Sequence, residues 1–254
     1  MYAILIDPVT RALSYAAVPT PSPRDDEVLI RVHAAGVNRA DLLQREGNYP
    51  PPPGCPEWMG LEVSGEICAM GPLAARHWRI GDRVCALLGG GGYAQFVAVR
   101  YDMCLPVPAG VSMTEAAAIP EAFATAYLNL FREADAKSGD TVLVTAGGSG
   151  LASVMIPMAK YAGLSVITTV RSAEKAAAIA SLGADVVLNT REIPLSAYFA
   201  AHPGEVDIAV DCVGGAEVGL CLPHMARGGR WIVIAALGGE TATVDLRQLY
   251  VRGV

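Results

Sequence analysis

Strand and helix patterns alternate along the second half of the chain, and this alternation constrains the fold more than any other feature. Near-continuous apolar strands that alternate with helices are typical of a parallel sheet covered on both faces. The pattern therefore predicts a doubly wound α/β domain. After a helical stretch, "TEAAAIPEAFATAYLNLFREA", the expected strands are 141–145, 164–169, 185–188, 206–212 and 230–236, and the expected helices are 151–162, 172–182 and 215–226.

The first half of the chain has a different pattern. Short apolar runs bounded by turn-forming residues predict the strands of a compact β-rich domain, as in "EVLIRVHAAGV", "LEVSGEICAM", "GDRVCALL" and "YAQFVAV". The stretch "NYPPPPGCP" is a rigid, extended loop, because each proline fixes its own φ and restricts the residue before it. This loop could line a pocket or act as a spacer, and the residues alone favour the spacer.

Composition excludes several classes of function. The chain has 254 residues, 52% of them hydrophobic, and a formal net charge of −6, so it lacks the basic excess that a nucleic-acid backbone requires. The cysteines show no C-x-x-C spacing, which favours free thiols in a reducing compartment. The N-terminus does not resemble a secretion signal, and the apolar stretches are shorter than the roughly 20 residues of a membrane span. We expect a soluble, cytoplasmic protein with neither a nucleic-acid nor a membrane partner.

A glycine-rich turn follows the first strand of the alternating half. The stretch "TVLVTAGGSGLASVM" supplies a strand, then Gly147, Gly148, Ser149 and Gly150, and then a helix. At such a turn, free backbone N–H groups and the helix dipole favour a pyrophosphate. Many tight turns use glycine, so the glycines alone are weak evidence. The strand before them and the helix after them favour a nucleotide site.

The end of the next strand indicates which dinucleotide would bind. A free 2′-hydroxyl on the adenine ribose is usually held by an acidic side chain, whereas a 2′-phosphate needs positive charge. The stretch "VITTVRSAEK" has no acid at the end of the strand, and Arg171, Ser172 and Lys175 follow it. An arginine fork and a lysine one helical turn later suit a phosphate, which favours NADPH over NADH. The alternative is an ordinary solvated helix start.

A series of motifs runs collinearly along nearly the whole chain: "AAGVNRADLLQREGNYPPPPG", "GLEVSGEI", "WRIGDRVCALLGGGGYAQFVAV", "AAAIPEAFATAY", "SGLASVMIPMAK", "LGADVVLN", "VDCVGGAEV" and "GGRWIVIAALGG". In this order they resemble the zinc-free quinone oxidoreductases of the medium-chain dehydrogenase/reductase superfamily, and among these the p53-inducible subgroup. The resemblance implies a β-rich, GroES-like catalytic domain at residues 1–117 and a Rossmann NADPH-binding domain at 118–254. It also implies hydride transfer from the nicotinamide C4 of NADPH to a quinone or a conjugated enone.

The resemblance extends to the question of a metal. Zinc-dependent relatives carry a cysteine after "AAGV" and a histidine before the glutamate of "G-x-E", where this chain has Asn38 and Leu61. Neither replacement is a good zinc ligand. We therefore expect no metal, and a reaction that does not need a Lewis acid to stabilise an alkoxide.

The resemblance also places two catalytic residues, Asn38 and Tyr49, beside the substrate. Each can donate a hydrogen bond to the acceptor oxygen as negative charge develops, and either Tyr49 or solvent could deliver a proton. Without the resemblance, Asn38 could equally be a turn or cap residue, and Tyr49 a surface aromatic in a proline loop.

Cofactor contacts are implied at the nicotinamide, at the pyrophosphate turn, at the 2′-phosphate and at two later strand ends. The expected cofactor-binding residues are Thr125, Gly147, Ser149, Gly150, Leu151, Ala152, Arg171, Ser172, Lys175, Cys212, Val213, Gly214, Ala235, Leu237 and Gly238.

The chain departs from the family pattern at several places. Ala152 stands where a glycine lets the helix pack closely, and Thr190 replaces a tyrosine beside the 2′-phosphate. Pro157 removes a helical hydrogen bond, which costs about 3 kcal/mol or forces a kink. Relatives continue past "LRQLYVRGV" with a strand that pairs across a twofold axis and a segment that completes the catalytic domain. We therefore expect the last sheet strand to be missing and the homodimer of the family to lack a contact.

Two other functions stay open beside quinone reduction. An enoyl-thioester reductase of the same superfamily would share the hydride step and differ in its substrate. A catalytically impaired or non-catalytic NADPH-binding protein is favoured by Pro157 and by the shortened end of the chain.

Overall fold

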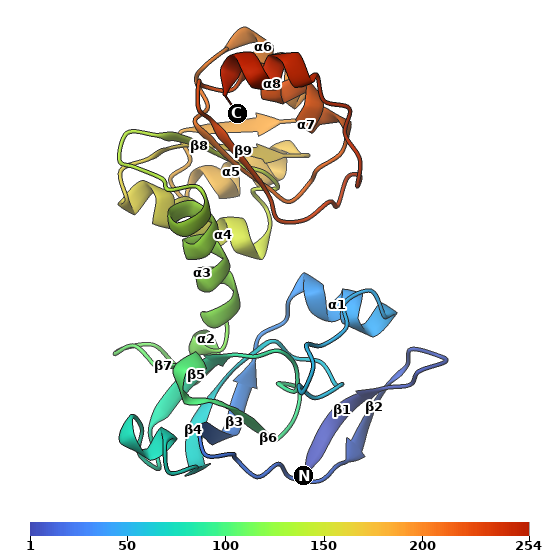
Figure 1. Ribbon diagram of the computed structural model, residues 1–254, viewed down its shortest axis with the longest axis vertical. Coiled ribbons are helices and arrows are strands. Elements are labelled where there is room, and N and C mark those ends of the chain that lie inside the picture. The colour runs from blue at the N-terminus through green and yellow to red at the C-terminus, as the bar shows by residue number, and fades with distance from the viewer. Residues whose placement is uncertain (254) are drawn as a thin grey trace. The chain divides into compact units, whose positions relative to one another are not determined.

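The computed structural model describes residues 1–253, which form two compact units. Unit 1 is Met1–Glu121 and unit 2 is Ala122–Val254, and Figure 1 shows their elements coloured along the chain. The division falls slightly after the boundary that we expected between residues 117 and 118.

An antiparallel sheet forms the core of unit 1. The apolar runs of the first half supply its strands, as the sequence predicted, and side chains such as Val28, Ile67 and Val97 pack together in the core. A separate hairpin is formed by β1 (Tyr2–Ile6) and β2 (Leu13–Ala17). The sheet has the order β6-β3-β4-β5-β7 and comprises β3 (Glu27–Ala35), β4 (Glu62–Met70), β5 (Arg83–Leu87), β6 (Phe96–Arg100) and β7 (Cys104–Pro106).

Short helices connect the strands of unit 1. Helix α1 was not among the expected elements, although its ends carry recognisable signals. It begins after Asn38, whose backbone N–H donates to Asp41 Oδ2 at 2.7 Å, and it ends at Gly47, whose φ of 85° glycine adopts without strain. The helical segments of unit 1 are α1 (Arg39–Glu46), the 3₁₀ turns η1 (Ala74–Arg76) and η2 (Tyr101–Met103), and α2 (Met113–Ala116).

A parallel sheet organises unit 2, in agreement with the predicted strands. Its order is β10-β9-β8-β11-β12, and each neighbouring pair is parallel. The winding direction changes between β8 and β11, and open α/β sheets bind their ligands at the carboxyl ends of the strands beside such a point. The strands are β8 (Thr141–Val144), β9 (Ser165–Val170), β10 (Val186–Asn189), β11 (Ile208–Asp211) and β12 (Arg230–Val233).

Helices cover both faces of this sheet. Val142 and Val144 of β8 pack in one core cluster with Met155, whereas the intervening Leu143 packs in another with Phe199. Because successive side chains of a strand point to opposite faces, the two clusters lie on opposite faces of the sheet. The helical segments that follow β8 in this unit are α4 (Gly150–Tyr161), α5 (Ala173–Ala180), α6 (Leu195–Ala201), α7 (Ala216–Cys221), η4 (Leu222–His224) and α8 (Leu246–Arg252).

The stretch that we expected to be one helix, "TEAAAIPEAFATAYLNLFREA", is divided. After α2, a new helix, α3 (Pro120–Tyr127), begins at its proline, and a π-helix, η3 (Leu128–Glu133), follows directly. Proline disfavours helical φ and ψ at the residue before it, and it lacks the N–H that a first helical position does not use. Pro120 therefore ends one helix and starts the next.

Helix α4 continues through Pro157 to Tyr161. Pro157 and Ser153 are both exposed, so water can reach the Ser153 carbonyl that the missing N–H leaves without its helical partner. Ala152, in contrast, is fully buried in the core behind the glycine-rich turn. The helix thus tolerates both departures without a break. Among the described residues, no helix has the length and apolar character needed to cross a membrane.

Candidate functional site

A cavity of about 780 Å³ lies in unit 2 at the carboxyl ends of the parallel strands. Its lining includes Ser149 after β8, Arg171 after β9, Thr190 after β10 and Gly214 after β11. Segments that are far apart in sequence therefore meet at this edge. The position is the one that the change of winding predicts for a ligand site in a doubly wound sheet.

The glycine-rich turn is fixed by close backbone packing. The N–H of Gly147 donates to the carbonyl of Thr169 at 2.7 Å, and a Cβ at this position would meet Thr168 Oγ1 at 2.5 Å. Ala146 before it has a φ of 52°, a backbone conformation that residues other than glycine rarely adopt. Ser149 then caps α4, because its side chain accepts from the N–H of Ala152 at 3.1 Å. The turn thus presents the N-terminus of α4 to the cavity.

Asp211, at the end of β11, holds the opposite side of the cavity. It is 2% exposed, and its carboxylate accepts hydrogen bonds from the Thr145 hydroxyl at 2.8 Å and from the Trp231 indole N–H at 3.2 Å. It also accepts from the backbone N–H groups of Val213, at 2.8 Å, and Gly214, at 3.2 and 3.1 Å. This buried acid therefore fixes the loop after β11 relative to the end of β8.

Three cationic side chains line the cavity at the ends of β9 and β10: Arg171, Lys175 and Arg191. Within the part of the chain that the structure describes, none of them forms an ion pair. Thr190 beside them donates its hydroxyl to the carbonyl of Val170 at 3.2 Å. The cluster supplies positive charge and hydrogen-bond donors, which are the groups that proteins use to bind phosphate.

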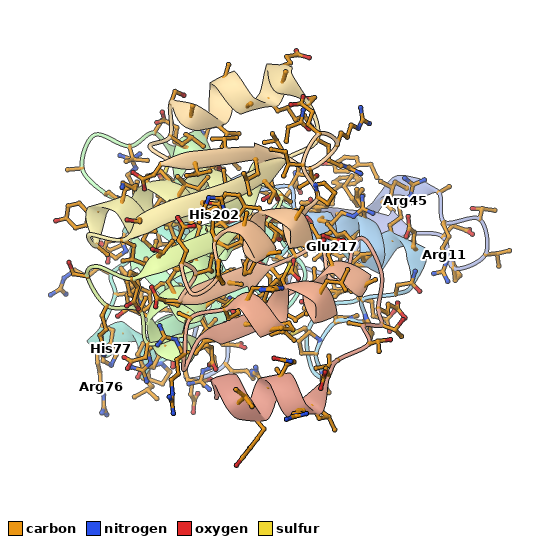
Figure 2. All side chains as sticks on the ribbon, turned by 90° about the horizontal axis from the view of Figure 1, so that it is seen from above. Arg11, Arg45, Arg76, His77, His202 and Glu217 are labelled. Carbon is orange, nitrogen blue, oxygen red and sulfur yellow. The ribbon has the colours of Figure 1, made fainter. Side chains whose placement is uncertain are left out.

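Two acids, Asp211 and Glu217, also line the cavity and balance this charge in part. Glu217, labelled in Figure 2, lines the cavity from α7. Its carboxylate accepts hydrogen bonds from the backbone N–H of Ser196 at 2.9 Å and from the Ser196 hydroxyl at 3.3 Å. Glu217 therefore ties α7 to the start of α6 while it faces the same cavity.

The cavity brings together about half of the expected cofactor-binding residues. Those that line it are Ser149, Arg171, Ser172, Lys175, Val213, Gly214, Leu237 and Gly238. Others lie in the same segments outside its lining, namely Gly147, Gly150, Leu151, Ala152, Cys212 and Ala235, and Thr125 lies in α3.

The residues outside the lining have visible structural roles. Gly147 and Ala152 are needed for close packing, and the Cys212 thiol is tied to Thr145, to whose carbonyl it donates at 3.5 Å. Burial also raises the pKa of the Cys212 thiol, so it is not a reactive thiolate. Sequence reasoning missed Asp211, Trp231 and Arg191 among the lining residues. The signal for Asp211 was its position at the end of an expected strand.

Unit 1 holds Asn38 in a network of buried acids. The side-chain N–H of Asn38 donates to Glu62 Oε1 at 2.8 Å, and Glu62 Oε2 accepts from the backbone N–H of Glu121 at 2.9 Å. Asp41 accepts from the Tyr93 hydroxyl at 2.9 Å and from the N–H of Gly60 at 3.2 Å. The hydrogen bond to Glu62 therefore orients the side-chain amide of Asn38, which is also the residue directly before α1.

Burial raises the pKa values of Glu62, Glu121 and Tyr93. Desolvation raises the pKa of Glu62, although hydrogen bonds from Glu121 and Asn38 oppose the shift. Desolvation also raises the pKa of Glu121, and so does the charge of Glu62 beside it. The pKa of the Tyr93 phenol is raised as well, by burial and then by the charge of Asp41. Tyr93 is therefore a hydrogen-bond donor and not a phenolate.

Tyr49 lies elsewhere in unit 1. It is 44% exposed and lines a second cavity, of about 570 Å³, together with Pro50, Pro51 and Trp58. The proline loop thus lines a cavity, contrary to the spacer role that we favoured from the residues. Asn38 is not among the lining residues of this cavity. Of the two expected catalytic residues, Asn38 is bonded to Glu62, whereas Tyr49 lines the second cavity.

Asn38 and Leu61, which the resemblance places where zinc-dependent relatives carry ligands, have other surroundings in the structure. Asn38 is bonded to Glu62, and Leu61 is 4% exposed within the core. Among the described residues, no group of three or more histidine, cysteine, aspartate or glutamate side chains is arranged to hold a metal ion.

Two family models match the chain. The model described as "Alcohol dehydrogenase GroES-like domain" matches residues 24–109, and the model described as "Zinc-binding dehydrogenase" matches residues 150–254. They fall in unit 1 and unit 2 respectively.

Known proteins resemble the chain over most of its length. It is 32% identical over 91% of its residues to mouse prostaglandin reductase-3, of which it spans 61%, and 33% identical over 87% to human quinone oxidoreductase, of which it spans 68%. The chain thus spans less than two thirds of the first of these relatives. The quinone oxidoreductase of Thermus thermophilus, solved also in complex with NADPH, superposes with a TM-score of 0.81 at 33% identity, covering 100% of this chain and 78% of that one.

Proposed function

The chain belongs to the medium-chain dehydrogenase/reductase superfamily, and we propose that it is an NADPH-dependent oxidoreductase that reduces a quinone or a conjugated enone without zinc. The observation that carries this proposal is the cavity of unit 2, where a glycine-rich turn and three cations meet at the carboxyl ends of the parallel strands. The names of the relatives support the class of acceptor.

Unit 2 would hold the dinucleotide. The turn at Gly147–Ser149 and the N-terminus of α4 suit the pyrophosphate, because free N–H groups and the helix dipole stabilise negative charge there. Arg171, Lys175 and Arg191 would bind the 2′-phosphate that distinguishes NADPH from NADH. The Thr190 hydroxyl is directed to the carbonyl of Val170, so Arg191 beside it would supply the further contact to this phosphate.

Unit 1 would supply the groups that contact the acceptor. Asn38 uses one amide hydrogen on Glu62, so its second amide hydrogen is available for the acceptor oxygen. Glu62 fixes the direction of that donor, and a donor oriented in advance stabilises the charge that develops on the oxygen. Tyr49 is exposed and can donate its phenolic proton to the same class of acceptor.

Reduced nicotinamide supplies the hydride when the cofactor is bound. In the overall reaction, one quinone, one NADPH and one proton give one hydroquinone and NADP⁺. The residues of this chain bind, orient and donate hydrogen bonds. Leu61 and Asn38 occupy the places of zinc ligands, and reduction of an electron-poor acceptor does not need a metal to stabilise an alkoxide.

Cofactor binding tests the proposal independently of turnover. The fluorescence of NADPH should change on titration with the full chain, and the change should persist after treatment with a chelator. Oxidation of NADPH should then be measured with a small quinone, with a conjugated enone and with a crotonyl thioester. A preference for the thioester would reassign the chain to enoyl reduction, and binding without any oxidation would identify a non-catalytic NADPH-binding protein.

A further inference from the structure

The cavity of unit 2 holds positive and negative side chains that do not pair with each other. Arg171, Lys175 and Arg191 line it at the ends of β9 and β10, and Glu217 lines it from α7. None of the ion pairs in the described part of the chain involves any of these four residues. The cavity therefore offers positive charge in one place and a hydrogen-bond acceptor in another.

The Glu217 carboxylate has room for a further donor. Each of its oxygens accepts one hydrogen bond, Oε2 from the N–H of Ser196 at 2.9 Å and Oε1 from the Ser196 hydroxyl at 3.3 Å. A carboxylate has about four acceptor positions, so about half of them remain open. Glu217 is partly exposed, whereas Asp211, the other acid of the lining, is 2% exposed and bonded to Thr145 and Trp231. Glu217 is therefore the acid that can receive a donor from a ligand.

Apolar side chains surround this acid along the chain. Leu195, directly before Ser196, and Val218, directly after Glu217, both line the cavity, and so does Pro194. The hydrogen bonds between Ser196 and Glu217 join the start of α6 to α7, so these apolar residues belong to one wall. Apolar walls with a few placed polar groups are typical of sites for small ring systems. The wall suits the face of a flat ring, and the acid suits a donor on its edge.

We propose that Glu217 recognises the adenine base of NADPH, because its carboxylate accepts a hydrogen bond from the 6-amino group while the apolar wall contacts the ring. The inference rests on the proposed binding of NADPH in this cavity. The base and the 2′-phosphate are attached to the same ribose, so the base stays close to the cations that hold the phosphate. The 6-amino group is a donor and a carboxylate only accepts, so the two are complementary. Glu217 thus selects the base, as the cations select the phosphate.

An NADPH analogue that lacks the 6-amino group provides the test. In reduced nicotinamide purine dinucleotide phosphate, a hydrogen atom replaces that group, whereas the ring, both riboses and all phosphates remain. Calorimetric titration of the full chain should give a dissociation constant for the analogue about tenfold or more above that of NADPH, since a hydrogen bond to a charged group is lost. The ratio of these two dissociation constants is the amino preference.

Glu217→Ala removes the acceptor, and the amino preference should fall to about one. Loss of the contacts with Ser196 would weaken both nucleotides alike, so a merely structural role of Glu217 leaves the ratio unchanged. Glu217→Gln keeps the shape of the side chain without its charge, and its amino preference should lie between those of the natural chain and Glu217→Ala. Should Glu217→Ala fail to fold, Glu217→Gln carries the comparison.

Glu205→Ala is the matched control. Glu205 is an exposed acid of the same unit that also ties a helix, because it accepts a hydrogen bond from the Tyr198 hydroxyl at 3.1 Å, and it lies outside the cavity lining. This variant has the same change of net charge as Glu217→Ala and should keep the full amino preference.

The proposal is overturned if the natural chain binds NADPH and the analogue equally, or if both Glu217 variants keep the full amino preference. NADPH titration of the same samples separates this result from the proposed function. Equal binding of the two nucleotides with intact NADPH affinity refutes the role of Glu217 alone. Absence of NADPH binding refutes the proposed function and this inference together.

Discussion

Gly147, in the turn after β8, lies directly against Thr168 of β9. A Cβ on Gly147 would meet Thr168 Oγ1 at 2.5 Å, and that hydroxyl is itself fixed because it donates to the carbonyl of Val144 at 2.7 Å. The contact between the turn after β8 and strand β9 therefore by itself requires a glycine at this position. This relationship explains why a residue of the expected phosphate turn lies outside the cavity lining.

Gly147→Ala should lower the free energy of unfolding by about 1–3 kcal/mol, because the added methyl group overpacks a fixed contact. It should also weaken NADPH binding, because the turn has to shift. Urea denaturation and NADPH titration measure the two effects. Gly150→Ala is the matched control, since a Cβ there would meet no described atom within 4 Å, and its unfolding free energy should change by less than about 0.5 kcal/mol. Equal losses in the two variants would refute the steric explanation.

Replacing the cavity's cations should affect NADPH and spare NADH. Arg171→Ala, Lys175→Ala and Arg191→Ala should each raise the dissociation constant of NADPH by about tenfold or more, since each removes a charge-assisted hydrogen bond. Binding of NADH, which lacks the 2′-phosphate, should change little. Arg227→Ala, an exposed arginine outside the cavity lining, is the control for net charge. Parallel losses for both nucleotides would show that these residues do not recognise the 2′-phosphate.

Pro157→Ala should stabilise the protein. An alanine N–H can donate to the carbonyl of Ser153, and the ring no longer crowds that carbonyl, so the free energy of unfolding should rise by about 1–3 kcal/mol. Because Pro157 is exposed, the change should leave NADPH affinity as it is. Thermal and urea unfolding report the stability. A variant that is less stable than the natural chain would show that α4 depends on the proline in some other way.

Glu62→Gln should change how stability depends on pH. Burial raises the pKa of Glu62 above its ordinary value of 4.5 in the folded chain. A carboxyl with a raised pKa contributes stability below its unfolded pKa, and this contribution is lost as the pH rises through the folded pKa. The natural chain should therefore lose stability with rising pH across this window more steeply than Glu62→Gln. Removal of Glu62 also removes a cause of the raised pKa of Glu121, which adds to the effect.

Urea unfolding over a series of pH values measures this slope. Glu66→Gln provides the control, because Glu66 is on the same strand with its side chain 45% exposed and paired with Arg31. Its pH profile should match that of the natural chain. If Glu62→Gln also leaves the profile unchanged, the buried network does not titrate as described.

The periodic parts of the fold could be predicted from sequence. The apolar runs gave the strands of both sheets, and the alternation with helices gave the parallel sheet of unit 2. Helices α1, α6 and α8 were missed because each is short and lacks a long apolar stripe. The long helix after Ser112 was expected as one piece because its composition is helical throughout, whereas Pro120 divides it.

Only those residues of the candidate site that directly follow a recognisable strand could be predicted from sequence. Arg171 and Lys175 could be found because they directly follow a recognisable strand. Asp211 and Arg191 reach the same cavity through the tertiary fold, and a linear pattern does not show which residues at several strand ends converge. The second cavity is lined by Gln44 of α1 and by residues of β1, and no sequence motif indicates that these two segments come together.

Quinone-dependent oxidation of NADPH by the chelator-treated full chain tests the central claim most directly. The loss of reduced nicotinamide absorbance should require both the protein and the quinone, and kcat/KM should be about tenfold or more higher with NADPH than with NADH, since the second cofactor lacks the charged group that the cations bind. Failure to oxidise NADPH with either the quinone or the enone would contradict the account.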